Sequence, residues 1–265
     1  MRTLMAIGGA MDEENPALMR EFIRRAGGDA ARLVILPQAS ELAETGENYA
    51  ARFRELGAGQ VTVMDFHTRE AAGTPQQVKL LRKASGIFIT GGAQMRLAVL
   101  FGGTRLEPEL MAAFQRGCLV GGTSAGAAIL SKTMIANGRG GATPRDRMVQ
   151  FSPGFGFSHH FIFDQHFRER DRLGRLIYAV STNPGIVGVG IDENTAAVVE
   201  EDDVITVYGS GAVTIVDGSN ISATDVAEVG RREAVAVAGL TVHVLTQKGT
   251  YRRKEHAAFL PGRDS

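Results

Sequence analysis

The chain has one cysteine, no tryptophan, no excess of either charge and no long apolar run. A disulfide within the chain is impossible, and the apolar neighbours of Cys118 predict a buried strand position rather than a reactive thiol. Lys plus Arg equals Asp plus Glu at 29 each, so no overall field favours nucleic acid as a partner. No run is long enough to cross a membrane, and the apolar part of residues 1–9 is too short for a secretory signal. We therefore expect a cytoplasmic protein with neither a membrane nor a nucleic-acid partner.

What is present is typical of a globular enzyme. The chain has 265 residues, of which 44% are hydrophobic and 22% charged, and this is enough to bury a substantial core. We expect residues 1–265 to form a single α/β catalytic domain. A separate C-terminal domain is the alternative, but no polar or Pro-rich linker supports it.

Short apolar runs alternate with helix-period segments in the first half of the chain. This alternation predicts βαβ units, a parallel sheet covered by helices, and a ligand site at the carboxyl ends of the strands. The predicted strands are 4–7, 32–36, 60–64, 86–89 and 119–120, and the predicted helices are 16–26, 47–56, 75–83 and 107–116.

The pattern changes after residue 185, where short strands are separated by turn residues. We expect these strands to form a mixed-sheet extension of the same domain, with mixed or antiparallel pairing. Lys248 and Gly249 are typical of a hairpin tip between Thr246 and Tyr251. The predicted strands are 186–191, 196–200, 204–208, 212–216 and 240–246.

The sequence GGTSAGA at residues 121–127 places Ser124 in a Gly-x-Ser-x-Gly motif directly after an apolar run. A serine hydroxyl becomes an effective nucleophile when a sharp strand-to-helix turn exposes its oxygen, and the flanking glycines leave room for that turn. The backbone N–H groups that follow can stabilise a developing oxyanion. Ser124 is therefore our predicted nucleophile, with a purely structural turn as the alternative.

A serine nucleophile needs a base, and His166 lies at the predicted end of the strand 161–163. The alternative is that Asp164 caps a helix over 167–180 and His166 only occupies its first turn. The pair His159 and His160 has too few neighbouring ligands for a metal site.

The sequence offers several acids that could orient the histidine and does not choose among them. Glu193 follows the predicted strand 186–191 and completes the chain order Ser, His, acid. Asp146 would give the order of an α/β-hydrolase. Asp164 and Asp192 are also available, and Asp192 and Glu193 are equally compatible with an ordinary turn.

Two further segments accompany these residues. In a helix over 167–180, Arg168, Arg172 and Arg175 share one face, which is more typical of a solvated surface than of a binding site. Next to His166, however, such a guanidinium cluster would suit recognition of carboxylates at the rim of the site. Gly91 and Gly92 follow the strand 86–89 and can turn a backbone N–H into the site, as the second half of an oxyanion hole.

Four motifs together resemble the cyanophycinase family of serine exopeptidases. They are TGGAQ at 90–94, GGTSAGA at 121–127, DQHF at 164–167 with arginines after it, and GIDENTA at 190–196. The 42-residue spacing from Ser124 to His166 also suits that family. The resemblance extends from the first strand to the C-terminal strands.

The resemblance implies a three-layer, mostly parallel α/β fold like class I glutamine amidotransferase domains, which are flavodoxin-like. It also implies a homodimer without a metal or organic cofactor. The implied activity is hydrolysis of cyanophycin, a polyaspartate that carries arginine on each side chain, to β-Asp-Arg dipeptides through an acyl-enzyme. Family members often have a polar residue at the position of Ala93, so this edge of the pocket departs from the pattern.

The family pattern implies a role for each residue of the site. Ser124 is the nucleophile, His166 the base and Glu193 the acid. From the mechanism itself, we predict that the N–H groups of Gly92 and Ala125 form the oxyanion hole. The implied substrate-binding residues are Gln94, Asp164, Gln165, Arg170, Arg172 and Arg175.

Two other functions stay open. An aspartyl or isoaspartyl dipeptidase would share the nucleophile and the fold but act on small peptides. A non-catalytic ligand-binding protein would keep the serine turn as a scaffold. An amidotransferase is disfavoured, because Ser124 stands where that chemistry uses a thiolate.

Overall fold

The first half of the chain forms the parallel strands and covering helices that its alternating pattern predicts. The computed structural model describes residues 2–262, so both ends of the predicted domain 1–265 lie outside the described part. The elements in chain order are β1 Leu4–Ile7, α1 Ala17–Ala26, β2 Arg32–Leu36, α2 Thr45–Glu55, β3 Gln60–Val63, α3 Pro75–Lys83, β4 Gly86–Ile89, α4 Gln94–Phe101, α5 Leu106–Gln115 and β5 Leu119–Thr123.

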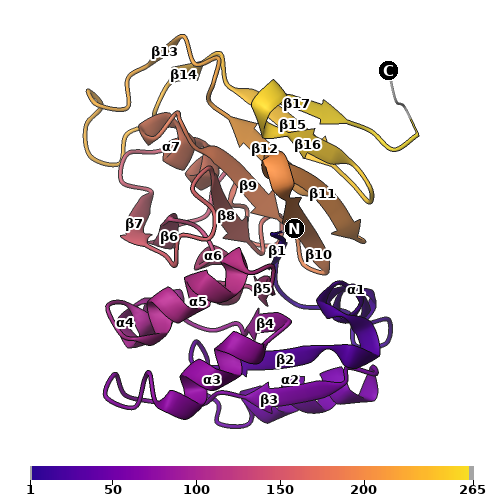
Figure 1. Cartoon of the computed structure of the whole chain (residues 1–265). Coiled ribbons are helices and arrows are strands. Elements are labelled where there is room, and N and C mark those ends of the chain that lie inside the picture. The colour runs from indigo at the N-terminus through magenta and orange to yellow at the C-terminus, as the bar shows by residue number, and fades with distance from the viewer. Residues whose placement is uncertain (1, 263–265) are drawn as a thin grey trace.

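These strands form the parallel part of a nine-stranded sheet with the order β17-β16-β11-β10-β1-β5-β4-β2-β3. The strands from β1 to β3 in this order pair in parallel, and β10 joins β1 in antiparallel fashion. The sheet has thus a parallel half built from the N-terminal strands and an antiparallel half built from C-terminal ones (Figure 1). The strands of the antiparallel half are β10 Thr195–Glu200, β11 Val204–Gly209, β16 Thr250–Arg252 and β17 Ala257–Phe259.

Four of the remaining strands form a second sheet, so the mixed-sheet extension expected from the sequence is divided between two sheets. Its order is β15-β12-β9-β8, with β8 and β9 parallel and the other pairs antiparallel. The predicted hairpin at Lys248 and Gly249 is wrong, because β15 and β16 belong to different sheets and the turn between them crosses from one to the other. The strands are β8 Phe161–Gln165, β9 Val187–Ile191, β12 Val213–Asp217 and β15 Thr241–Leu245.

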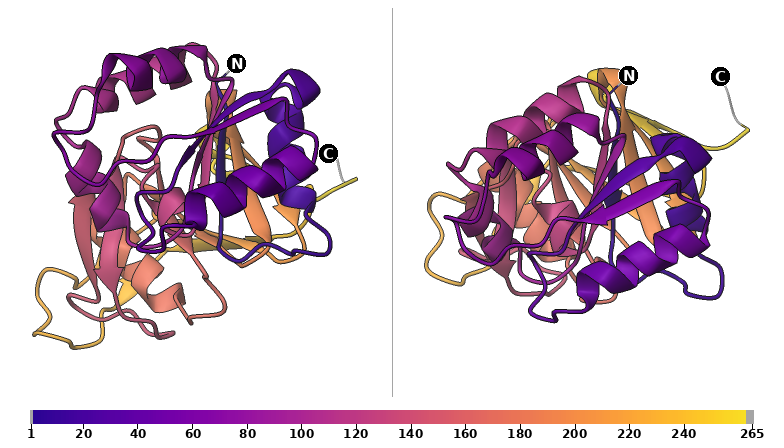
Figure 2. Two further views of the ribbon diagram at one scale, coloured as in Figure 1. Left: turned by 90° about the horizontal axis from the view of Figure 1, so that it is seen from below. Right: turned by 60° about the horizontal axis from the view of Figure 1, so that its bottom comes forward.

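Alternating side chains divide the interior into layers. On one face of the large sheet, Met5 and Phe88 pack against Phe22 of α1 and Phe53 of α2. Its other face packs against α3, α4, α5 and the second sheet in one continuous core. Helix α7, Leu173–Thr182, covers the outer face of the second sheet. Figure 2 shows the N-terminal strands and the C-terminal strands side by side. This is a layered α/β fold of the flavodoxin-like class.

Helix α7 begins six residues later than the predicted helix 167–180. The backbone has positive φ at His166 and at Asp171 (46° at each), which a right-handed helix does not allow. The segment 167–172 is therefore a turn, and the three arginines predicted on one helical face do not share one. The shorter elements are α6 Ala125–Ala128, β6 Thr133–Gly138, β7 Val149–Pro153, β13 Ala223–Thr224, β14 Val237–Ala238 and the 3-10 segments Gly28–Ala30, Glu201–Asp203 and Arg253–Glu255.

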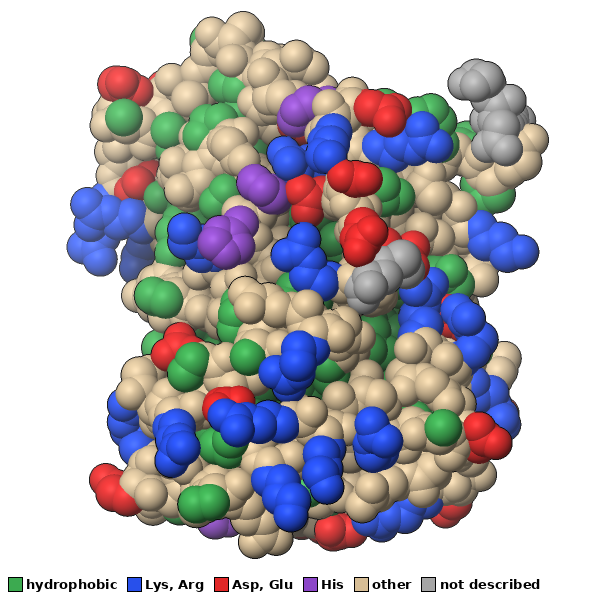
Figure 3. All heavy atoms as spheres, in the orientation of Figure 1, with side chains coloured by type: hydrophobic (Ala, Val, Ile, Leu, Met, Phe, Trp, Pro, Cys, Tyr) green, Lys and Arg blue, Asp and Glu red, His purple; other side chains and the backbone are tan. Residues whose placement is uncertain are grey.

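The distribution of charges on the surface and the length of the helices agree with the sequence, which has equal numbers of acidic and basic residues and no long apolar run. Acidic and basic side chains are both spread over the face seen in Figure 3. Within residues 2–262, every helix is too short or too polar to cross a lipid bilayer.

Candidate active site

Ser124 stands at the sharp turn between β5 and α6. Its backbone has φ 54° and ψ −114°, a conformation that a residue with a side chain seldom adopts. A Cβ at Gly122 or Gly126 would run into the carbonyl oxygen of Ile89 in β4, so both glycines of the motif allow close packing. The Ser124 N–H donates to Ile7 O at 3.0 Å. The turn is thus held against the ends of two neighbouring strands.

His166 directly follows β8 and reaches the serine from the second sheet. Its Nε2 lies 2.9 Å from Ser124 Oγ. Its backbone N–H donates to Gly8 O at 2.5 Å, and a Cβ at Gly9 would overlap the imidazole ring. Gly9 therefore packs directly against the histidine.

Glu193 is the acid that contacts His166. Its Oε1 lies 2.6 Å from the ring Nδ1. A neutral imidazole that donates its Nδ1 proton to this carboxylate leaves Nε2 free to accept the Ser124 proton. The structure thus joins Ser124, His166 and Glu193 in one hydrogen-bonded chain.

The other three acids considered from the sequence have different partners. Asp192 accepts the backbone N–H groups of Arg168 and Ala212, each at 3.1 Å. Asp164 pairs with two arginines, and Asp146 lies between β6 and β7, 3.4 Å from its neighbour Arg147. Their positions leave Glu193 as the acid at the imidazole.

Burial sets the charge state of the histidine. Desolvation lowers the pKa of His166 below its usual value, and the nearby charge of Arg170 lowers it further. The hydrogen bond that the ring donates to Glu193 raises the pKa but does not outweigh burial. The ring is therefore neutral near pH 7, the form that can accept a proton.

The turn after β1 contacts residues next to the proposed nucleophile and acid. Gly9 O accepts the Thr123 hydroxyl at 2.7 Å, and Ala10 O accepts the N–H of Asn194, the residue after Glu193, at 2.7 Å. Neither Thr123 nor Asn194 is predicted from the sequence as a functional residue. The Gly8-Gly9 pair at a predicted strand end is the sequence feature that could have indicated these contacts, because glycines allow another backbone to approach closely.

The backbone N–H groups of Gly92 and Ala125 have no hydrogen-bond acceptor within residues 2–262. Gly92 has φ 137°, and a Cβ there would overlap Ala39 O. Gly91 lies beside the nucleophile, since a Cβ on it would stand 3.8 Å from Ser124 Oγ. Both predicted oxyanion-hole residues thus lie on turns that flank the serine.

Four of the six predicted substrate-binding residues form a buried cluster close to His166 in the sequence: Asp164, Gln165, Arg172 and Arg175. Arg175 donates to both carboxylate oxygens of Asp164, with Nε at 2.6 Å from Oδ2. Arg172 contacts Asp164 Oδ1 at 3.3 Å and Gln165 Oε1 at 3.0 Å. Because Arg172 and Arg175 are only 8% and 4% exposed, two of the three guanidinium groups predicted at the rim of the site are buried, and only Arg168 is exposed.

Arg170 and Gln94 lie outside that cluster. Arg170 is exposed on the turn before α7. Gln94 begins α4, and its amide nitrogen donates to the carbonyl oxygens of Ile135 and Ala136, each at 2.9 Å. Gln94 thus anchors β6 next to the site.

The structure offers little for a metal ion among its described residues. Within residues 2–262, His, Cys, Asp and Glu side chains nowhere gather in a group of three or more that could hold one. His159 and His160 are both exposed, and His160 lies 3.8 Å from Asp203.

This chain is similar to known proteins along most of its length. The chain is 40% identical over 246 residues to the "Cyanophycinase" of Nostoc sp. (strain PCC 7120), covering 92% of this chain and 83% of that protein. It is 37% identical over 257 residues to the "Cyanophycinase" of Geminocystis herdmanii (strain PCC 6308), covering 96% and 94%.

A solved structure has the same fold. The crystal structure of a peptidase from an acI-B1 Actinobacterium superposes with a TM-score of 0.66 at 23% identity, over 95% of this chain and 97% of that one. The model of peptidase family S51 matches residues 4–207, which include Ser124, His166 and Glu193. With its serine turn, fold and relatives in agreement, this chain belongs to peptidase family S51.

Proposed function

We propose that this protein is a serine-type exopeptidase that hydrolyses cyanophycin to β-Asp-Arg dipeptides through an acyl-enzyme. The observation that carries the proposal is the continuous contact from Ser124 Oγ through His166 to Glu193, with distances of 2.9 Å and 2.6 Å. The substrate is supported by relatives named cyanophycinase that align with more than nine-tenths of the chain.

The first half of the reaction forms the acyl-enzyme. Ser124 Oγ attacks the scissile carbonyl carbon while His166 Nε2 takes the hydroxyl proton. The negative charge that develops on the carbonyl oxygen is held by the N–H groups of Gly92 and Ala125. His166 then gives its proton to the leaving nitrogen, the carbon–nitrogen bond breaks, and the product amine departs.

The second half releases the acyl group. His166 takes a proton from water, and the resulting hydroxide attacks the ester carbonyl carbon under the same oxyanion hole. The ester bond breaks, and Ser124 Oγ recovers a proton from the imidazole. Glu193 keeps the ring oriented and stabilises its charged form in both halves.

The buried cluster around Asp164 supports a positioning role for some of the predicted binding residues. Asp164 is fully paired with Arg172 and Arg175, so these three hold β8 against α7. In our proposal the more exposed Arg170 meets the carboxylates of the polymer, whereas Gln94 and Gln165 shape the wall of the site.

The competing functions have less support. A non-catalytic scaffold has no need for a strained serine, a neutral histidine and a carboxylate in contact. A dipeptidase for small peptides would use the same three residues, but the cyanophycinase relatives align along nearly the whole chain.

Replacing Ser124 with alanine tests the proposal. We expect unmodified enzyme incubated with cyanophycin to release fragments with the mass of β-Asp-Arg, and Ser124→Ala to lower turnover by about a thousandfold or more. Unchanged folding and polymer binding in the variant would assign the loss to chemistry. Full activity of Ser124→Ala would rule out the serine mechanism, whereas cleavage of Asp-containing dipeptides alone would favour the dipeptidase.

We also propose that residues 1–265 form one catalytic domain, since Ser124 comes from the large sheet and His166 from the second sheet. The resemblance to the family supports a homodimer in the cytoplasm. Sedimentation velocity giving a monomer at micromolar concentration, or fractionation placing the protein outside the cytoplasm, would contradict this part of the proposal.

A further inference from the structure

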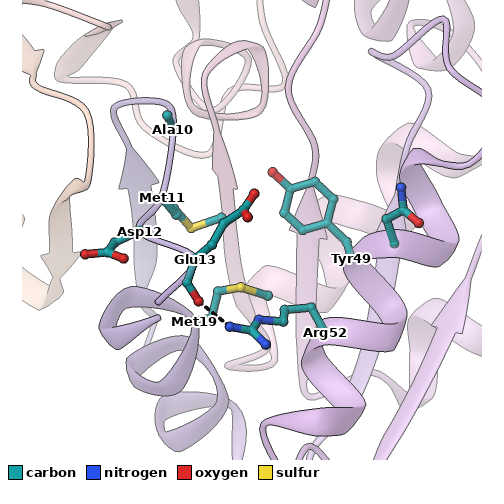
Figure 4. A pocket seen from close by; sticks show the side chains of 8 residues that line it. Ala10, Met11, Asp12, Glu13, Met19, Tyr49 and Arg52 are labelled. Atoms are coloured by element: carbon teal, nitrogen blue, oxygen red, sulfur yellow. Dashed lines mark hydrogen bonds between the residues drawn. The ribbon is translucent and has the colours of Figure 1, made fainter. Parts of the chain in front are cut away.

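A cavity of about 680 Å³ opens beside the turn that supports His166 (Figure 4). It lies between the loop after β1 and the helices α1 and α2. Ala10 forms part of its wall and directly follows Gly9, the glycine that packs against the His166 ring. The cavity thus begins at the residue that follows this glycine.

The loop that borders this cavity is tied to the active site at two points. The Asp12 N–H donates to Asn194 Oδ1 at 3.1 Å, and the Asn194 N–H donates to Ala10 O. Asn194 is the residue after Glu193. The loop that borders the cavity is therefore hydrogen-bonded to the residue next to the proposed catalytic acid.

The wall of the cavity combines an acid with apolar groups. Figure 4 shows the side chains of Glu13 and Tyr49 turned toward each other across it, with the thioethers of Met11 and Met19 beside them. The Tyr49 ring is fixed by packing against Phe88, with 5.2 Å between the ring centroids. Burial raises the pKa of Tyr49, so its hydroxyl stays neutral.

The carboxylate of Glu13 is the charged group in this cavity that no other group of the described residues pairs with. Its carboxylate has no hydrogen-bond or ion-pair partner within residues 2–262. Asp12 Oδ1 already accepts the N–H groups of Glu14 and Asn15, each at 2.9 Å. Arg52 contacts Glu55 at 3.1 Å and donates to the backbone carbonyl of Glu13.

We propose that this cavity is a subsite for an arginine side chain of the bound substrate, a proposal that rests on the function proposed above. The guanidinium group would donate to the Glu13 carboxylate and lie near the Tyr49 ring. The methylene groups of the arginine would pack on Met11 and Met19. This arrangement selects a long cationic side chain over a neutral one of the same shape.

The test compares two soluble oligomers that differ only in charge at this position. One carries arginine on each aspartate, and the other carries citrulline, in which a neutral urea replaces the guanidinium group. We expect Glu13→Gln to lower kcat/KM for the arginine oligomer about fivefold, as for a partly exposed ion pair. The same variant should change kcat/KM for the citrulline oligomer by less than about twofold. Glu14→Gln, an adjacent acid outside the cavity, is the matched control and should change neither value.

The possible outcomes separate the subsite from the proposed function. If unmodified enzyme cleaves both oligomers equally well, or if Glu13→Gln slows both by the same factor, the arginine subsite is wrong while the peptidase activity stands. Cleavage of neither oligomer would overturn both proposals. Selective loss on the arginine oligomer supports the subsite.

Discussion

At the scale of single residues, the site depends on backbone conformations that most side chains avoid. Ser124 and His166 both have positive φ, and so does Asn194 (49°) next to Glu193. Such conformations are uncommon outside glycine and persist where the surrounding structure imposes them. Here the end of β1 and the turn after it impose them, because carbonyl oxygens of residues 7–10 accept the backbone N–H groups of Ser124, His166 and Asn194.

The roles of His166 and Glu193 predict a specific pH dependence. Activity requires the neutral imidazole, so kcat/KM should rise with pH through the pKa of His166, which burial places below its usual value of 6.5. Glu193→Gln removes the contact that raises this pKa. We therefore expect the variant to lose activity by about a hundredfold or more, with the acidic limb of the pH profile moved to lower pH.

Asp192→Asn is the control for this experiment, because Asp192 touches backbone N–H groups and not the imidazole. Its acidic limb should coincide with that of the unmodified enzyme. A limb that moves in Asp192→Asn and stays in place in Glu193→Gln would show that the acid is Asp192.

At the scale of elements, Asp164 joins β8 to the start of α7 through Arg172 and Arg175. Asp164→Asn leaves two buried guanidinium groups without their anion, and we expect the free energy of unfolding to fall by about 3–5 kcal/mol. Urea denaturation followed by circular dichroism measures this loss. Burial lowers the pKa of Arg172 to about 10, which agrees with a site where an unpaired charge is costly.

The exposed pair of Asp202 with Lys254 provides the comparison. Asp202→Asn should leave the urea midpoint nearly unchanged, because water already solvates both charges. Equal midpoints for Asp164→Asn and the unmodified protein would mean that the buried cluster contributes nothing to holding α7.

The elements also show how far the sequence could predict the fold. The apolar runs at 4–7, 32–36 and 86–89 coincide with strands because side chains buried on both faces leave a strong local pattern. The start of α7 could not be found in this way. A helical period continues through 167–172, and only the positive φ at Asp171, set by tertiary contacts, breaks it.

At the scale of the whole molecule, the division of the C-terminal strands between two sheets could not be predicted from the sequence. The strands β12 and β16 are both short and bounded by turns. They belong to different sheets because they pair with different, distant strands, β9 and β11. The same partition brings Ser124 and His166 together from different sheets. The turn glycines and the strand-end positions predicted the residues, but not the route by which they meet.

Asp217 links these two sheets and predicts how stability responds to acid. From the end of β12, its Oδ2 accepts the Tyr251 hydroxyl of β16 at 2.5 Å and His256 Nδ1 at 2.7 Å. Burial acts to raise the pKa of Asp217, but the hydrogen bonds from Tyr251, Ser219 and His256 together lower it below its usual 3.8. The ionised form thus stabilises the folded state above pH 3.8, and this contribution is lost as the pH falls through the lowered pKa.

We expect Asp217→Asn to lower the free energy of unfolding at pH 7 by about 1–3 kcal/mol, with the difference from the unmodified protein shrinking below about pH 4. Unfolding curves across this pH range measure it, and a difference that stays constant down to pH 3 would show that the carboxylate does not couple the sheets through its charge.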